Sequence, residues 1–275
     1  MTKALSTTDF RAVRHILEPH DFALGGDEED PLPTDQIELE VWHGIMDLPD
    51  DVAIRTSDHH GKHLELLQSL WGDWIVAVGN PRRKHDELFG CMLDANDCLQ
   101  CATFELLHGF CRAAIANLRT ALELVMIGAL GNCQPTHPKY QRWQRSDVEN
   151  FGFSYCRGQF LEQHRGGSLE WLFEKKSGFP ALLYAELCNY THARPDSTDS
   201  ELWESNGPVY SGRAFFKSFK LCLDVYATCY LLVKIGRPAF RLPKNSKILF
   251  ELDWMTRHAE LAQAYGQLYL GKPKK

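Results

Sequence analysis

Five ionisable side chains recur at helical spacing inside an apolar stretch of the chain: Glu105, His108, Arg112, Arg119 and Glu123. At about 100° per residue, all five are expected on one face of a helix, within an arc of roughly 60°. Apolar residues occupy the remaining faces, which indicates a central helix with Leu118 and Leu122 in its core. We therefore expect the polar strip to face a cleft, a buried ion-pair network or a thin layer of solvent.

A second segment carries side chains that complement this strip. Asn189 and His192 are three residues apart and share a face at the end of a predicted helix. Packed against Arg112 and Arg119, they would add an amide and an imidazole to two guanidinium groups and the Glu123 carboxylate. Arginine binds phosphate with a fixed fork of donors and histidine exchanges a proton near neutral pH, so this set suits a phosphodiester. The alternative is structural: Arg119 and Glu123 form an i,i+4 pair, and His192 caps its own helix.

The elements that must position these groups are predicted to be helices. They are expected at residues 8–17, 63–78, 86–131, 168–176, 180–192, 212–235 and 249–270. The proline-free segment 86–131 is either one long helix or two in close succession. Residues 37–42 alternate weakly, as a short strand would, and residues 135–167 form a partly helical excursion. The fold class is therefore an all-α multi-helix bundle, residues 61–275, to which an irregular acidic N-terminal arm, residues 1–60, is packed or tethered.

Charge is distributed unevenly along the 275 residues. Residues 1–60 hold 14 acidic against 4 basic side chains, whereas residues 213–275 hold 12 basic against 4 acidic ones. This asymmetry suits an anionic partner near the C-terminal third or an acidic arm that covers a basic surface, although ordinary solvated surface gives the same counts. No apolar run of 18 residues and no signal-peptide core is present, and we expect the nine cysteines to be reduced. The chain is expected to be cytoplasmic, with no membrane contact.

The sequence motifs give little support for metal or nucleotide chemistry. Cys98-x-x-Cys101 and His108-x-x-Cys111 carry zinc-binding residue types, but on one continuous helix Cys98 and Cys111 would lie about 20 Å apart. His59-His60-x-x-His63 lacks the glutamate of a zinc hydrolase. The chain also contains no glycine-rich phosphate loop and no Gly-x-Ser-x-Gly elbow. We therefore predict neither a metal site nor a cofactor.

The polar segments also carry a family likeness. The run Leu-His-Gly-Phe-Cys-Arg-Ala-Ala-Ile-Ala-Asn-Leu-Arg-Thr-Ala-Leu-Glu-Leu at residues 107–124, followed by Leu-Tyr-Ala-Glu-Leu-Cys-Asn-Tyr-Thr-His at residues 183–192, resembles the helical core of the HEPN superfamily. The likeness extends over residues 86–238. It implies a helical bundle, frequent dimerisation and, in active members, metal-independent RNA cleavage by an Arg-x4-6-His motif, often in toxin–antitoxin or phage-defence systems.

The chain departs from that pattern at one position that matters. The residues that should supply the arginine before His192 are Ala185, Glu186 and Leu187. If the protein cleaves RNA, we hypothesise that Arg119 replaces the missing arginine and acts with His192. The candidate site therefore has His192 and Arg119 as catalytic residues, with Arg112, Asn189, His108 and Glu123 as substrate-binding residues.

Two functions of different classes follow. The first is a HEPN-like conflict or stress protein that binds RNA or a nucleotide and can act as a metal-independent endoribonuclease. The second is a non-catalytic helical interaction protein or antitoxin-like scaffold, in which the strip is an ion-pair network and the acidic arm or an exposed helix face contacts a protein partner. The likeness to a frequently dimeric family also predicts a homo-oligomer.

Overall fold

The fold is described from a computed structural model, which describes residues 39–79, 86–147, 151–191, 207–252 and 257–271. The chain divides into two compact units, Met1–Asp47 and Leu48–Lys275. This division lies closer to the N-terminus than the predicted end of the arm at residue 60. The helix predicted at residues 8–17 and the acidic stretch that follows it lie outside the described residues.

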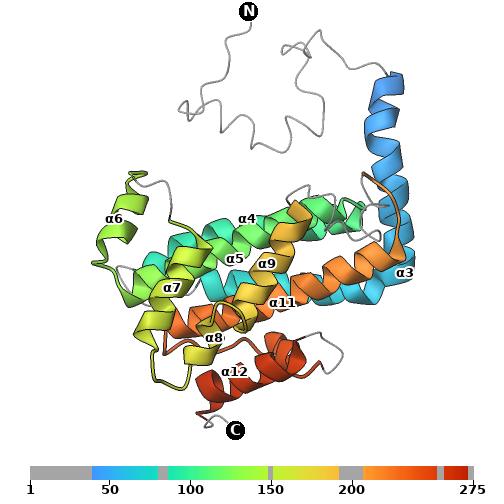
Figure 1. The fold of residues 1–275 in the computed structure, drawn as a ribbon. Helices are drawn as coiled ribbons and strands as arrows, with labels where there is room; N and C mark the ends of the chain where they lie inside the picture. Colours follow the sequence, from blue (N-terminus) through green and yellow to red (C-terminus); the bar gives the residue numbers. More distant parts are fainter. Residues whose placement is uncertain (1–38, 80–85, 148–150, 192–206, 253–256, 272–275) are drawn as a thin grey trace, which may run out of the picture. The chain divides into compact units, whose positions relative to one another are not determined.

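The described residues form nine α-helices and one 3-10 helix, and they contain no strand, which confirms the predicted all-α multi-helix bundle (Figure 1). The first described helix, α3, spans Leu39–Val78, so the weakly alternating residues 37–42 do not form a strand where they are described. Alternation over six residues is a weak signal, and a helix that continues far beyond it overrides it. The helix is kinked at His60, whose backbone angles, φ −128° and ψ 19°, are not helical.

Helices α4 (Glu87–Leu107) and α5 (Cys111–Cys133) form an antiparallel hairpin rather than one long helix. Gly109 reverses the chain with a φ of +81°, and a Cβ atom there would lie 2.6 Å from the Val209 carbonyl oxygen. At the opposite end, Asn132 donates a hydrogen bond to Asp86 at 3.0 Å, which ties the end of α5 to the start of α4. The prediction that five polar residues share one helix face is therefore wrong, because the turn separates Glu105 and His108 from the rest.

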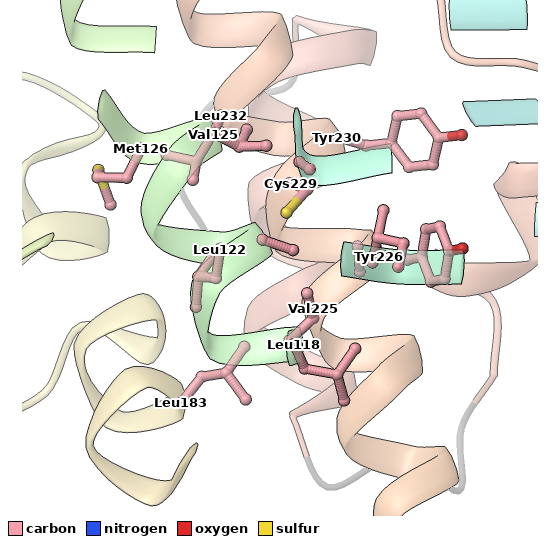
Figure 2. Packing of buried hydrophobic residues seen from close by; sticks show 14 of the residues in the cluster. Leu118, Leu122, Val125, Met126, Leu183, Val225, Tyr226, Cys229, Tyr230 and Leu232 are labelled. Atoms are coloured by element: carbon pink, nitrogen blue, oxygen red, sulfur yellow. The ribbon is translucent and has the colours of Figure 1, made fainter. Parts of the chain in front are cut away.

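Helix α5 is the central helix of the bundle, as predicted. It packs against α4, α7 (Phe153–Gln163), α9 (Phe179–Thr191) and α11 (Gly212–Gly236). Leu118 and Leu122 are almost fully buried, which confirms their predicted core positions. Figure 2 shows these leucines in one cluster with Leu183 of α9 and Val225 of α11.

The remaining described elements agree in part with the predicted ranges. Helices α9 and α11 match the predictions closely, and the excursion contains α6 (Pro138–Gln144) as well as α7. The helix expected at residues 168–176 is reduced to α8 (Glu170–Phe173). The C-terminal helix α12 (His258–Leu270) begins later than predicted, after the 3-10 helix Asn245–Phe250.

Among the described residues, α5 alone is long and apolar enough to cross a membrane. More than half of its most apolar window is buried inside the bundle. The central helix of a soluble protein has the same length and composition, so α5 is compatible with a soluble bundle.

Candidate functional site

The predicted strip is divided between two helices and a turn. Glu105 is in the last turn of α4, and Asn117 of α5 donates a hydrogen bond to its Oε2 at 2.9 Å. Burial raises the pKa of Glu105, although the Asn117 bond lowers it. The Glu105 carboxylate therefore joins the two arms of the α4–α5 hairpin.

His108 lies in the turn, where its Nδ1 is 2.8 Å from the Phe104 carbonyl oxygen. Its ring is packed on the Phe104 ring at a centroid distance of 4.1 Å. These contacts hold His108 against the end of α4.

Arg112 connects α5 to the end of α9. Its Nε and Nη2 both donate to the Tyr190 carbonyl oxygen, each at 3.3 Å. A cation at the C-terminus of a helix is stabilised by the carbonyl groups that lack a helical partner there. Beside Arg112 lies a hollow of about 330 Å³, lined by Phe110, Arg112, Ala113, Ala116, Tyr190, Thr191 and Gly207.

Arg119 connects α5 to the middle of α9. Its Nη2 donates to the Tyr184 hydroxyl at 3.0 Å, and the guanidinium carbon lies 5.3 Å from the centre of the Tyr184 ring. The Tyr184 ring in turn stacks on Phe153 of α7 at 4.1 Å. Burial raises the pKa of Tyr184 to about 12, and the Glu123 charge adds to this rise while Arg119 opposes it. The Tyr184 phenol is therefore neutral near pH 7 and accepts the arginine bond.

Glu123 holds the start of α7. Its Oε1 accepts a hydrogen bond from the Phe153 backbone N–H at 2.9 Å, in the first turn of that helix. A Cβ atom at Gly152, the N-cap of α7, would lie 2.5 Å from the same oxygen. The second carboxylate oxygen is 3.8 Å from Arg119, a long and partly exposed pair that contributes little. Glu123 is thus chiefly a helix cap, with glycine at residue 152 leaving room for its carboxylate.

Of the two candidates from the second segment, Asn189 alone belongs to the described residues. Asn189 is on α9 but exposed, whereas Tyr184 and Tyr190 make the contacts to Arg119 and Arg112. His192 lies outside the described residues. Helices α5 and α9 do pack against each other, and their polar contacts are made by Tyr184 and Tyr190, which the sequence reasoning did not select.

A larger hollow, of about 620 Å³, lies between α3 and α4. We call it the α3/α4 groove, and its lining residues are Ser57, Gly61, Leu64, Glu65, Gln68, Trp71, Gln100, Thr103, Phe104 and Leu107. Its single ionisable lining residue, Glu65, is paired with Lys62 at 2.8 Å. Phe104 is 61% exposed, an unusual fraction for a phenylalanine. The sequence reasoning missed this groove, although Leu64 and Trp71 carry the seven-residue spacing of one helix face.

A buried ionic cluster joins α9, α11 and the start of α12. Arg257 contacts Asp224 at 2.9 Å and Glu186 at 2.6 Å. Burial raises the pKa of Asp224 to about 6, although Arg257 lowers it. Because Asp224 is only 2% exposed, its carboxylate joins helices and is not accessible to a substrate.

Neither metal ligands among the described residues nor similar proteins identify a function for the site. Within the described ranges, no group of three or more His, Cys, Asp or Glu residues is placed to hold a metal ion. No family model, curated protein or solved structure matches the chain.

Proposed function

We propose that this chain is a non-catalytic helical interaction protein that binds a protein partner through the α3/α4 groove. The observation that carries the proposal is the difference between the two candidate surfaces. The charged groups of the strip already contact neighbouring helices, whereas the groove offers apolar side chains to solvent. A groove with exposed apolar side chains is suited to binding a partner.

The contacts of the strip argue against a reaction centre there. Catalysis by proton transfer needs a titratable group within hydrogen-bonding reach of the substrate. Arg119 is directed at Tyr184, and Glu123 is directed at the start of α7. A substrate would have to displace these internal partners and leave polar groups unpaired, at a cost of about 1–3 kcal/mol each.

The groove has the properties of a binding surface. Each 100 Å² of apolar surface that a partner covers contributes roughly 2.5 kcal/mol before the cost of association. Exposed aromatic side chains are frequent anchors of protein interfaces, and Phe104 occupies such a position.

The proposal is tested by co-purification with matched variants. Tagged wild-type protein, Phe104→Glu and the control Leu182→Glu are recovered from cells that make the protein naturally, and bound proteins are identified by mass spectrometry. Leu182 is an exposed leucine of α9, 44% accessible, outside the groove. We expect a partner that binds wild type and Leu182→Glu but not Phe104→Glu, and that binds again when both components are purified. Absence of any protein with that pattern would contradict the proposal.

A second candidate is the HEPN-like function, metal-independent cleavage of RNA. It is favoured by the position of Arg112, which lines a hollow at the end of α9. The last residue of α9, Thr191, directly precedes His192 in sequence. In this alternative Arg112 binds a phosphate, and Arg119 acts with His192. The test is incubation with total RNA and tRNAs in EDTA. Cleavage by wild type that is absent from folded Arg119→Gln and His192→Gln would support it, and intact RNA would count against it.

A further inference from the structure

The edges of the α3/α4 groove carry acidic side chains. Helix α4 contains four acidic residues, Glu87, Asp94, Asp97 and Glu105, and neither lysine nor arginine. Asp97 is exposed and lies three and seven residues before the groove residues Gln100 and Phe104, so it shares their side of α4. On α3, Glu65 lines the groove and is paired with exposed Lys62. Asp97 of α4 and Glu65 of α3 therefore place carboxylates beside an apolar floor, and Lys62 pairs with the one on α3.

The dimensions of the groove match a helix. Its lining residues on α3 extend from Ser57 to Trp71 across the kink at His60, which corresponds to at most about 21 Å at a rise of 1.5 Å per residue. Leu64 and Trp71 from α3 face Phe104 and Leu107 from α4 along this length. An amphipathic helix of four turns can place an apolar residue at each i, i+3, i+4 and i+7 position into such a floor.

The charge distinguishes between possible occupants. A second copy bound through the same surface would bring Asp97 and Glu65 of the two chains toward one another. Nucleic acid and anionic lipid would be repelled for the same reason. A helix with lysine or arginine beside its apolar face complements the acidic edges and the apolar floor together.

We infer that the α3/α4 groove binds an amphipathic helix of a partner protein whose apolar face is flanked by basic residues. This inference rests on the proposed interaction function and adds the chemistry of the partner. Phe104, Trp71 and Leu64 bind its apolar face, while Asp97 and Glu65 select the basic residues at its margins. The Lys62–Glu65 pair is exposed, with 88% and 67% of the two side chains accessible, so a competing cation can replace Lys62 at small cost.

The test uses three fluorescein-labelled peptides of roughly 18 residues, about five helical turns. The first is an amphipathic leucine–lysine helix, the second replaces each lysine by glutamate, and the third scrambles the first so that it has no apolar face. Binding to the full chain is measured by fluorescence anisotropy at low and moderate salt. We expect binding of the first peptide only, and weaker binding at higher salt.

Four variants locate the binding. Phe104→Glu should weaken the leucine–lysine peptide by at least about tenfold, since it places a charge in the apolar floor. Asp97→Asn and Glu65→Gln should each weaken it by about two- to fivefold and reduce its dependence on salt. Leu182→Glu should bind as wild type does. Circular dichroism confirms that each variant is folded.

Three results would overturn the inference: equal binding of the glutamate or scrambled peptide, unchanged binding by Phe104→Glu, or a wild-type oligomer that Phe104→Glu dissociates. Failure of the proposed function is distinguishable from failure of the inference. If no peptide binds but a co-purified natural partner depends on Phe104, the interaction function stands and the basic-helix assignment is rejected. If neither binds, both are rejected.

Discussion

The contact between Glu123 and the first turn of α7 gives a quantitative prediction. Gly152 has extended backbone angles, φ −130° and ψ −170°, which alanine adopts without strain. An added Cβ meets only the Glu123 side chain, with Oε1 at 2.5 Å and the carboxyl carbon at 3.7 Å. Gly152→Ala should therefore displace the carboxylate and remove its bond to Phe153, which costs about 0.5–2 kcal/mol of unfolding free energy.

The same substitution should have the opposite effect once Glu123 has been removed. In the Glu123→Ala background, Gly152→Ala meets no other atom within 4 Å. It then restricts only the unfolded chain, which stabilises the protein by about 0.4–1 kcal/mol. The unfolded-chain term is present in both backgrounds and cancels, so the double-mutant cycle should show a coupling energy of roughly 0.5–2 kcal/mol, the contribution of the lost capping bond.

Urea denaturation of the wild type, the two single variants and the double variant measures this coupling. Glu123→Gln is the control, since its amide oxygen can still accept the Phe153 bond and should lose little stability. Additive losses, with a coupling below about 0.3 kcal/mol, would refute the assignment of Glu123 as the cap of α7.

Three further predictions concern the core and the kink. Leu122→Ala should lower the free energy of unfolding, measured by urea denaturation, by about 2–5 kcal/mol. The control Leu182→Ala, at an exposed position, should lower it by less than about 0.5 kcal/mol, and an equally small loss in Leu122→Ala would contradict the burial of Leu122. Gly131→Ala should lower the free energy of unfolding by about 1–3 kcal/mol, because its Cβ would lie 2.3 Å from the Tyr140 ring. An unchanged midpoint of urea denaturation would refute that contact. Burial and the neighbouring histidines lower the pKa of His60, so the unfolded chain binds its proton more readily, and stability should fall as the pH decreases through about 6.5. Thermal melts at about pH 7.5 and 5.5 should show a smaller loss in His60→Gln than in wild type, and an equal loss in both would contradict this linkage.

Local sequence signals were sufficient to locate helices whose first turn carries a capping residue or a proline. The start of α11 follows Ser211, whose side chain accepts a hydrogen bond from the Ala214 N–H, and α9 has Pro180 in its first turn. Capping residues and proline act within one turn of the chain, so these elements can be read from neighbouring residues. The apolar spacing of α5 also sufficed to place Leu118 and Leu122 in the core.

The turn at Gly109 was not evident from the same signals. A glycine within a helical pattern costs only about 1 kcal/mol, so it does not by itself predict a reversal. The reversal depends on the packing of α4 along α5 and on the close approach of Val209, which is 100 residues away. The prediction placed the whole strip on one helix, so the turn at Gly109 means that its residues do not share one helix face.

The partners of the strip could not be predicted from spacing. Arg112 and Arg119 were selected from their spacing on α5, but their acceptors belong to Tyr190 and Tyr184, 78 and 65 residues away. The α3/α4 groove likewise forms only when two helices lie side by side. Periodicity identifies the face of one helix, and contacts between helices decide whether that face binds a neighbour or remains open.

Incubation of the purified protein with total RNA and a panel of tRNAs in EDTA tests most directly whether the strip is structural. Arg119→Gln and His192→Gln are included, and fragments are read on a denaturing gel. We expect intact RNA with all three proteins and lower thermal stability of Arg119→Gln, because its bond to Tyr184 is lost. Cleavage by wild type that disappears in both folded variants would contradict it and assign the α5–α9 contact to a ribonuclease site.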